Sequence, residues 1–138
     1  MAADSRRLSS RVVGIIGDSP FDSLENQILH VLHTRYNLRG KWMMKAIGRI
    51  AASRIGFPVK RATVLPIASR VRVPVLLFHG TEDRFVPIEM SEAIFDRLVG
   101  PKRFVVIEGA RHVMSFDQAT ERYESEMHKL MKACAFTD

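Results

Sequence analysis

The sequence predicts an α/β fold in which about three parallel strands form a sheet with helices on its faces. Short apolar runs of strand length recur at residues 11–17, 73–78 and 103–107. Segments with helical periodicity separate them, and strands that alternate with helices favour a parallel sheet. In the first run, Arg-Val-Val-Gly-Ile-Ile-Gly, apolar side chains fall on both faces, as in a strand that is covered on both sides.

The first strand is followed by turn residues, Asp18-Ser19-Pro20, and then by a helical pattern. Four apolar residues of this pattern share one stripe: Leu24, Ile28, Val31 and Leu32. Residues 37–40 should end this helix.

Residues 41–55 predict a second helix with two different faces. Cations recur every four residues on one face at Lys41, Lys45 and Arg49. The opposite face is apolar and consists of Met43, Ala46, Ile47, Ile50 and Ala51. Gly56-Phe57-Pro58 should end the helix.

The second half of the chain repeats the order of strand and helix. A short helix is expected over 63–70, before the strand at 73–78. Pro87 stands at a plausible first helical position, and Met90, Ile94 and Leu98 follow at spacings of four residues. Gly100-Pro101 should end that helix, and the strand at 103–107 comes next.

The last helix is expected to begin at Ser115-Phe116-Asp117-Gln118, which resembles a capping box. Its apolar residues form one stripe: Ala119, Tyr123, Met127, Leu130, Met131 and Cys134.

The composition is that of an ordinary globular chain. With 138 residues, 46% hydrophobic and 26% charged, it fits one domain, residues 1–138. No apolar run approaches the roughly 20 residues that span a bilayer, and the N-terminus lacks the apolar core of a secretory signal. The single Cys134 excludes an internal disulfide and suits a reducing compartment. We therefore expect a cytoplasmic protein.

The charge is unevenly distributed. The net charge is +6, and the segment 35–72 holds ten cations and no acid. The basicity therefore belongs to this one segment, which contains the helix expected over 41–55.

Chemistry-bearing residues follow the second and third predicted strands. Asp83 lies three residues past Gly80, and His112 follows Glu108-Gly109-Ala110-Arg111. Ligands of a parallel sheet bind beyond the carboxyl ends of its strands. An Asp there can orient an imidazole through one ring nitrogen while the other nitrogen takes a proton from a hydroxyl. Alone, Asp83 would be a helix-start acid and His112 a loop histidine; their joint occurrence favours the back half of a Ser-Asp-His triad.

The chain resembles the α/β-hydrolase superfamily, particularly its serine-aminopeptidase-like and acyl-esterase or lipase-like branches. The resemblance rests on His79-Gly80-Thr81-Glu82-Asp83-Arg84-Phe85-Val86-Pro87, on Gly109-Ala110-Arg111-His112 and on residues 12–23. It implies the C-terminal part of an α/β-hydrolase fold, with a helical cap insert over about 21–70. It also implies that Asp83 is the catalytic acid and His112 the base, in a hydrolase of ester, thioester or peptide bonds that needs no cofactor. Glu82 fits the acid position less well, and His79 is expected to pack at the strand end.

The nucleophile of such a triad is missing. No serine here has glycines two residues before and two residues after it. Gly17-Asp18-Ser19 is similar to the opening of another large esterase group, but no histidine here has the Asp three residues earlier that this group requires. We therefore expect a truncated hydrolase whose Ser lies outside the chain and which is inactive alone. An uncovered edge at the first strand should promote self-association.

A non-catalytic binding module is the alternative hypothesis. The basic amphipathic helix at 41–55 would then contact an anionic membrane or a partner through Lys41, Lys45 and Arg49. Nucleic-acid binding is not expected, because no recognised motif accompanies the charge. No cluster of His, Cys, Asp and Glu has the spacing of metal ligands.

Overall fold

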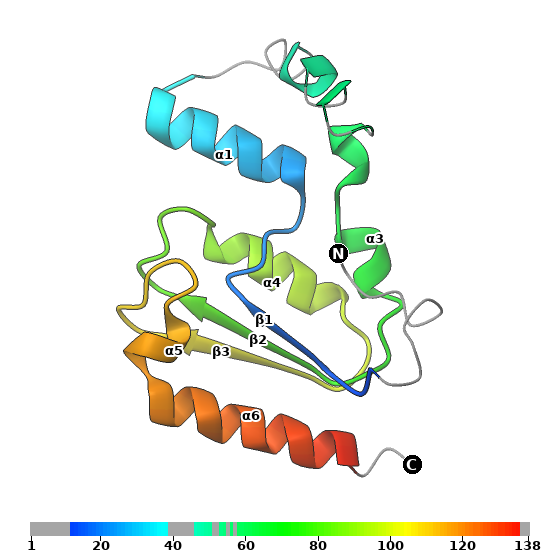
Figure 1. Cartoon of the computed structure of the whole chain (residues 1–138), viewed down its shortest axis with the longest axis vertical. Helices are drawn as coiled ribbons and strands as arrows, with labels where there is room; N and C mark the ends of the chain where they lie inside the picture. The colour runs from blue at the N-terminus through cyan, green and yellow to red at the C-terminus, as the bar shows by residue number, and fades with distance from the viewer. Residues whose placement is uncertain (1–11, 39–45, 51–52, 55, 57, 136–138) are drawn as a thin grey trace.

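A three-stranded parallel sheet is the centre of the molecule in the computed structural model (Figure 1). The structure describes residues 12–38, 46–50, 53–54, 56 and 58–135. The strands are β1 (Ile15–Asp18), β2 (Val75–Gly80) and β3 (Lys102–Ile107), in the order β1-β2-β3. Asp18 pairs with Phe78 and Gly80 pairs with Ile107, so all three strands end at one edge of the sheet. The predicted α/β class and parallel sheet are confirmed.

Helices cover both faces of the sheet (Figure 1). In chain order the helices are α1 (Leu24–Tyr36), the 3₁₀ turn η1 (Val59–Arg61), α3 (Leu65–Ala68), α4 (Ile88–Arg97), α5 (Ser115–Gln118) and α6 (Thr120–Ala135). Figure 1 shows α4 on one side of the sheet and α6 on the other.

The side chains of β2 alternate between two hydrophobic cores. Val75 and Leu77 pack with Ile94 and Leu98 at the α4 side, while Leu76 and Phe78 pack at the α6 side, where Tyr123 stacks on the Phe78 ring. All six residues of β2 are buried, because a central strand is covered on both faces. The α4 stripe predicted from Met90, Ile94 and Leu98 is confirmed, since all three are buried.

Three expectations need correction. The strand expected over 11–17 is shorter and leaves Ile16 40% exposed, because β1 lies at an edge of the described sheet. Pro87 is the N-cap of α4 and not its first helical residue. The capping box at Ser115 is absent, because Met114 is the N-cap of α5. The expected single helix is also interrupted at Ala119, and α6 begins at the next residue.

Most other predicted elements agree with the structure. Helix α1 ends at Asn37, whose left-handed φ of 50° closes it within the predicted break at 37–40. The short helix expected over 63–70 is α3, with four residues. The expected helix 41–55 falls partly outside the described residues, including Lys41 and Lys45; residues 46–50 and 53–54 are helical.

Within the described ranges, no helix is both long enough and apolar enough to cross a membrane.

Candidate functional site

A tight loop after β2 holds the carboxylate of Asp83. The Asp83 N–H donates to the Gly80 carbonyl at 3.2 Å, which closes the turn. The carboxylate folds back over the chain, and its Oδ1 accepts hydrogen bonds of 2.9 Å from the backbone N–H groups of Phe85 and Val86. Short acidic side chains favour this kind of turn because they can satisfy nearby backbone donors. The backbone of the loop therefore holds one of the two carboxylate oxygens, Oδ1.

A second loop after β3 carries His112, and it is joined to the Asp83 loop by backbone contacts. The Glu82 N–H donates to the Ala110 carbonyl at 3.0 Å, and the Gly109 N–H donates to the Thr81 hydroxyl at 2.9 Å. Gly80 permits this approach, because a Cβ at that position would lie 2.1 Å from the Ala110 carbonyl oxygen. The two loops thus form one unit.

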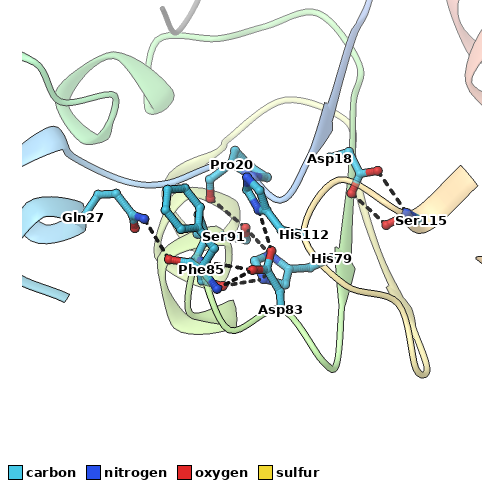
Figure 2. A network of polar contacts seen from close by, with 10 residues as sticks. Asp18, Pro20, Gln27, His79, Asp83, Phe85, Ser91, His112 and Ser115 are labelled. Atoms are coloured by element: carbon cyan, nitrogen blue, oxygen red, sulfur yellow. Dashed lines mark hydrogen bonds and ion pairs between the residues drawn. The ribbon is translucent and has the colours of Figure 1, made fainter. Parts of the chain in front are cut away.

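The structure brings the two predicted site residues together (Figure 2). Asp83 Oδ2 lies 2.8 Å from Nδ1 of His112. The Asp83 side chain is fully buried, whereas the His112 side chain is 35% exposed. The ring centroids of His112 and Phe85 are 4.9 Å apart. A carboxylate only accepts, so Nδ1 carries the proton of this bond. Nε2 has no hydrogen-bond partner among the described residues, and can serve another group.

The pKa of the Asp83 carboxyl lies below its ordinary value, so the charged form is favoured. Burial acts in the opposite direction and raises the pKa. The Val86 N–H, the His112 ring, Ser19 and the Phe85 N–H each lower the pKa, and together they outweigh burial. The Ser19 hydroxyl forms no hydrogen bond of good geometry with the described residues, but it is near enough to favour the charge. Asp83 is therefore a buried anion at neutral pH.

His79 is a member of this site that sequence reasoning missed (Figure 2). It is fully buried, and its Nε2 lies 3.0 Å from the Val86 carbonyl and 3.6 Å from Asp83 Oδ2. Because a carbonyl only accepts, Nε2 is the donor, and the bond closes the loop that carries Asp83. Nδ1 lies 2.7 Å from the Ser91 hydroxyl, which in turn donates to the Pro20 carbonyl at 2.8 Å. The spacing of His79 and Asp83 was visible in the sequence, but the loop that turns one toward the other was not.

The other acid and nucleophile considered from the sequence lie elsewhere. Glu82 is exposed and forms no hydrogen bond or ion pair with His112. Ser19 directly follows β1, with a left-handed φ of 51°, and is only 3% exposed. Its hydroxyl lies near Asp83, which is the wrong partner for a serine that should transfer a proton to the free nitrogen of His112.

A cavity of about 480 Å³ lies between α1 and the Asp83 loop. His30 and Thr34 of α1 line one side, and Thr81, Asp83 and Glu89 line the other. The Nε2 atom of His30 is buried without a hydrogen-bond partner among the described residues. Helix α1 therefore stands over the carboxyl end of β2, where a ligand of a parallel sheet is expected. No group of three or more His, Cys, Asp or Glu in the described part of the chain could hold a metal ion.

Comparisons with known proteins agree with this architecture. Residues 60–119, which include Asp83 and His112, match the serine aminopeptidase family S33. The structure of an esterase from Pyrococcus furiosus superposes with a TM-score of 0.64 and 20% identity, over 90% of this chain and 46% of the esterase. A monoacylglycerol lipase from Paleococcus ferrophilus gives a TM-score of 0.56 and 22% identity, over 96% of this chain and 62% of the lipase.

The uncharacterized protein YqkD of Bacillus subtilis is 22% identical over 116 residues, which are 84% of this chain and 38% of YqkD. The chain thus spans about two fifths of the length of that relative. The chain therefore has the fold of the α/β-hydrolases, and its residues 60–119 are similar to the serine aminopeptidase family.

Proposed function

We propose that this chain supplies the acid and the base of a serine hydrolase that acts on ester, thioester or peptide bonds. The observation that carries the proposal is the bond of 2.8 Å between the buried Asp83 carboxylate and Nδ1 of the half-exposed His112. General-base catalysis requires a fixed carboxylate on one ring nitrogen and a second nitrogen that is open to the nucleophile, and Nε2 of His112 has no partner in the described part of the chain. The esterase and lipase structures with the same fold support the class of reaction.

In the proposed reaction, a serine hydroxyl adds to the carbonyl carbon of the substrate and gives its proton to Nε2 of His112. The charged Asp83 stabilises the imidazolium that forms. Nε2 then passes the proton to the leaving oxygen, sulfur or nitrogen as the bond to the carbonyl carbon breaks. A water molecule, deprotonated by the same nitrogen, adds to the carbonyl carbon of the acyl-enzyme. Nε2 then returns the proton to the serine oxygen as the bond between that oxygen and the carbonyl carbon breaks, which releases the acid.

We further propose that the serine lies outside these 138 residues. No serine of the chain has the flanking glycines of a strained nucleophile turn, and Ser19 is buried beside Asp83. The chain also spans only about two fifths of the length of YqkD. The remaining part of a complete hydrolase would supply the nucleophile and the donors that stabilise the oxyanion.

Fluorophosphonate labelling tests where the nucleophile lies. The 138-residue chain should bind no probe and should not turn over p-nitrophenyl acetate. The native protein, captured from its host with an antibody against residues 102–135, should carry the probe on a serine that is absent from this sequence. Esterase turnover by the 138 residues that disappears in His112→Ala would refute an external nucleophile.

The roles of Asp83 and His112 are tested by single substitutions in the native protein, once it has been identified by this capture and expressed recombinantly. His112→Ala and Asp83→Asn should each lower kcat by about 10⁴-fold, because the base or its orienting carboxylate is lost. Glu82→Gln is the matched control, since the neighbouring carboxylate is exposed, and its kcat should be unchanged. Equal effects of Asp83→Asn and Glu82→Gln would contradict the assignment.

A second candidate function is non-catalytic docking on an anionic membrane or a partner through the basic amphipathic helix expected over 41–55, which lies within the basic segment 35–72. The segment contains ten cations and no acid, and Arg49, Arg54, Lys60 and Arg61 are exposed. In this case the hydrolase-like core is a scaffold, and the basic helix is the binding element.

A further inference from the structure

The loop that presents His112 contains a residue in an unfavourable backbone conformation. Val113, directly after His112, has a φ of 56°. A β-branched residue in the left-handed region costs of order 1–3 kcal/mol and persists only where the surroundings hold it. The Val113 side chain is 54% exposed, so its own burial contributes little. Contacts on both sides of Val113 must therefore hold this part of the chain.

On the N-terminal side, the loop is held by the contacts of Ala110 and Gly109 with the Asp83 loop. On the C-terminal side, the nearest long-range contact is made by Ser115 (Figure 2). Its hydroxyl donates to Asp18 Oδ1 at 2.7 Å, and its backbone N–H donates to Asp18 Oδ2 at 3.3 Å. Ser115 is fully buried, and the Met114 N-cap provides no side-chain bond of its own. Asp18 thus holds the start of α5 from 97 residues away in the sequence.

Asp18 is itself fixed by the sheet. It is the last residue of β1 and pairs with Phe78, and the N–H of the next residue, Ser19, donates to the Phe78 carbonyl at 2.9 Å. Burial and the charge of Asp18 raise the pKa of Tyr123 on α6, which places that charge beside the helices that follow the loop. The carboxylate therefore connects the end of one strand to the loop that follows another.

We propose that Asp18 is a positioning residue for His112. By anchoring Ser115 to the end of β1, it holds Val113 in its left-handed conformation and keeps the imidazole turned toward Asp83. This inference rests on the proposed function, in which His112 is the base. Asp18 touches neither His112 nor a reacting atom, so its effect travels through the backbone of residues 113–115.

Nuclear magnetic resonance of the 138-residue chain with ¹⁵N-labelled histidine tests the proposal. The ring ¹⁵N shifts report which nitrogen of His112 carries the proton, and contacts with the Phe85 ring report its orientation. Wild type should carry the proton on Nδ1 and show the Phe85 contact. Asp18→Ala should lower the ratio of this arrangement to the alternatives at least fivefold, since the two bonds from Ser115 are lost and one alone is worth about fivefold in that ratio. An unchanged Nδ1 proton and Phe85 contact would overturn the proposal.

Two controls separate positioning from general destabilisation. Asn26→Ala removes one side-chain bond of 2.8 Å, to Asp22, near the start of α1, and should leave His112 unchanged. Asp18→Asn keeps one oxygen acceptor for Ser115 and should restore part of the His112 signal. If Asn26→Ala shifts His112 as much as Asp18→Ala does, the effect is structural only and the proposal fails. If Asp18→Ala does not fold, Ser115→Ala tests the same anchor.

A double variant tests the mechanism directly. Asparagine tolerates the left-handed conformation that valine resists, so Val113→Asn should restore the Nδ1 proton of His112 in the background of Ser115→Ala or Asp18→Asn. No restoration would contradict a role through Val113. Asp83→Asn distinguishes this proposal from the proposed function. If this variant leaves the His112 proton on Nδ1, Asp83 does not orient His112, and both the proposed function and the role of Asp18 are refuted. If the ring proton of His112 moves in Asp83→Asn but not in Asp18→Ala, only the role of Asp18 is overturned.

Discussion

At the scale of single residues, the site depends on an acid that is buried and yet charged. Burial disfavours an anion, and a lone carboxylate in this position would take up a proton. Two backbone N–H groups and the imidazole of His112 reverse this tendency for Asp83. The carboxylate can therefore orient the base without competing with it for the proton.

The lowered pKa of Asp83 makes the stability of the fold dependent on pH. The folded chain binds a proton at this carboxyl less readily than the unfolded chain does. The Asp83 carboxyl therefore makes its full contribution to the free energy of unfolding when the pH is above its pKa in the unfolded chain. This contribution is lost from about pH 5 downward, as the pH falls through the pKa of Asp83 in the folded chain. Urea unfolding should show a smaller loss of stability between pH 6 and pH 3 in Asp83→Asn than in wild type.

Glu126 provides the comparison for this measurement. Burial opposes its charge, but Arg103 and Lys129 lower its pKa as well. Glu126→Gln should therefore also reduce the loss of unfolding free energy between pH 6 and pH 3. In the double variant Asp83→Asn/Glu126→Gln, the two reductions should add. Identical pH profiles for wild type and Asp83→Asn would show that the Asp83 pKa is not lowered.

Gly80 is the residue on which the approach of the two loops depends. In Gly80→Ala the new methyl group would overlap the Ala110 carbonyl oxygen, so the backbone must move. We expect a loss of about 3 kcal/mol of unfolding free energy and of the contact between Asp83 and His112. Gly48→Ala is the matched control: its Cβ meets nothing within 4 Å, and it should be neutral or stabilising by up to about 1 kcal/mol. Equal stabilities in urea unfolding would contradict the close-approach argument.

At the scale of elements, α6 is attached to the edge strand β3 by charge as well as by packing. Glu126 is only 5% exposed and faces Arg103 of β3, and Lys129 donates to its Oε1 at 2.8 Å. A buried carboxylate is costly unless it is paired. The pair therefore makes the contact between α6 and β3 specific, more than it adds stability.

Removal of Arg103 should expose this cost. Arg103→Ala leaves Glu126 with Lys129 alone, and we expect a loss of about 1–3 kcal/mol in unfolding free energy. In the double variant Arg103→Ala/Glu126→Gln most of this loss should disappear, because the unpaired charge is gone. A double-mutant cycle by urea unfolding measures the coupling, and additive effects would show that the two side chains do not interact.

Strand β1 has a neighbour on only one side in the described sheet, and Ile16 on it is 40% exposed. A free edge with apolar side chains is a template for pairing between chains. Self-association therefore remains our prediction, to be measured by light scattering. Ile16→Lys should shift the chain toward monomer, whereas Val99→Lys, at an even more exposed residue beyond α4, should not. A wild-type chain that is monomeric at all concentrations would contradict the prediction.

At the scale of the whole molecule, charge and chemistry lie in different segments. The basic segment 35–72 precedes β2, while Asp83 and His112 lie on loops after β2 and β3. Helix α1, whose last two residues belong to the basic segment, lines the cavity beside Asp83. Substitutions in the basic segment therefore test membrane docking, whereas substitutions at Asp83 and His112 test catalysis.

Vesicle binding tests the role of the basic segment. The chain should bind vesicles that contain phosphatidylserine, should not bind neutral vesicles, and should dissociate as salt is added. Charge reversal of Lys41, Lys45 and Arg49 should abolish binding, whereas reversal of three cations outside the segment, Lys102, Arg111 and Arg122, should have little effect. Equal binding by the two triple variants would assign the affinity to net charge alone.

Sequence reasoning was strongest where a pattern repeats along the chain. The three strands, the order of helices between them and the buried stripe of α4 follow from local periodicity. It was weakest where a side chain binds a distant segment of the chain instead of its neighbours in the sequence. Ser115 has the sequence of a helix cap, but its hydroxyl donates to Asp18 because β1 ends beside it. His79 was assigned only to packing, and it lies 3.6 Å from the Asp83 carboxylate.

By itself, the sequence determined the α/β class, the parallel sheet and the two loops that carry Asp83 and His112, because these depend on hydrophobic periodicity and on residues close together in the chain. Only the tertiary structure decided that the two side chains meet, since the contact requires β2 and β3 to be paired in register and Gly80 to lie against Ala110. It also brought Asp18 to Ser115 and His79 to Asp83. Contacts of this kind come from strand register and loop geometry, which no local pattern specifies.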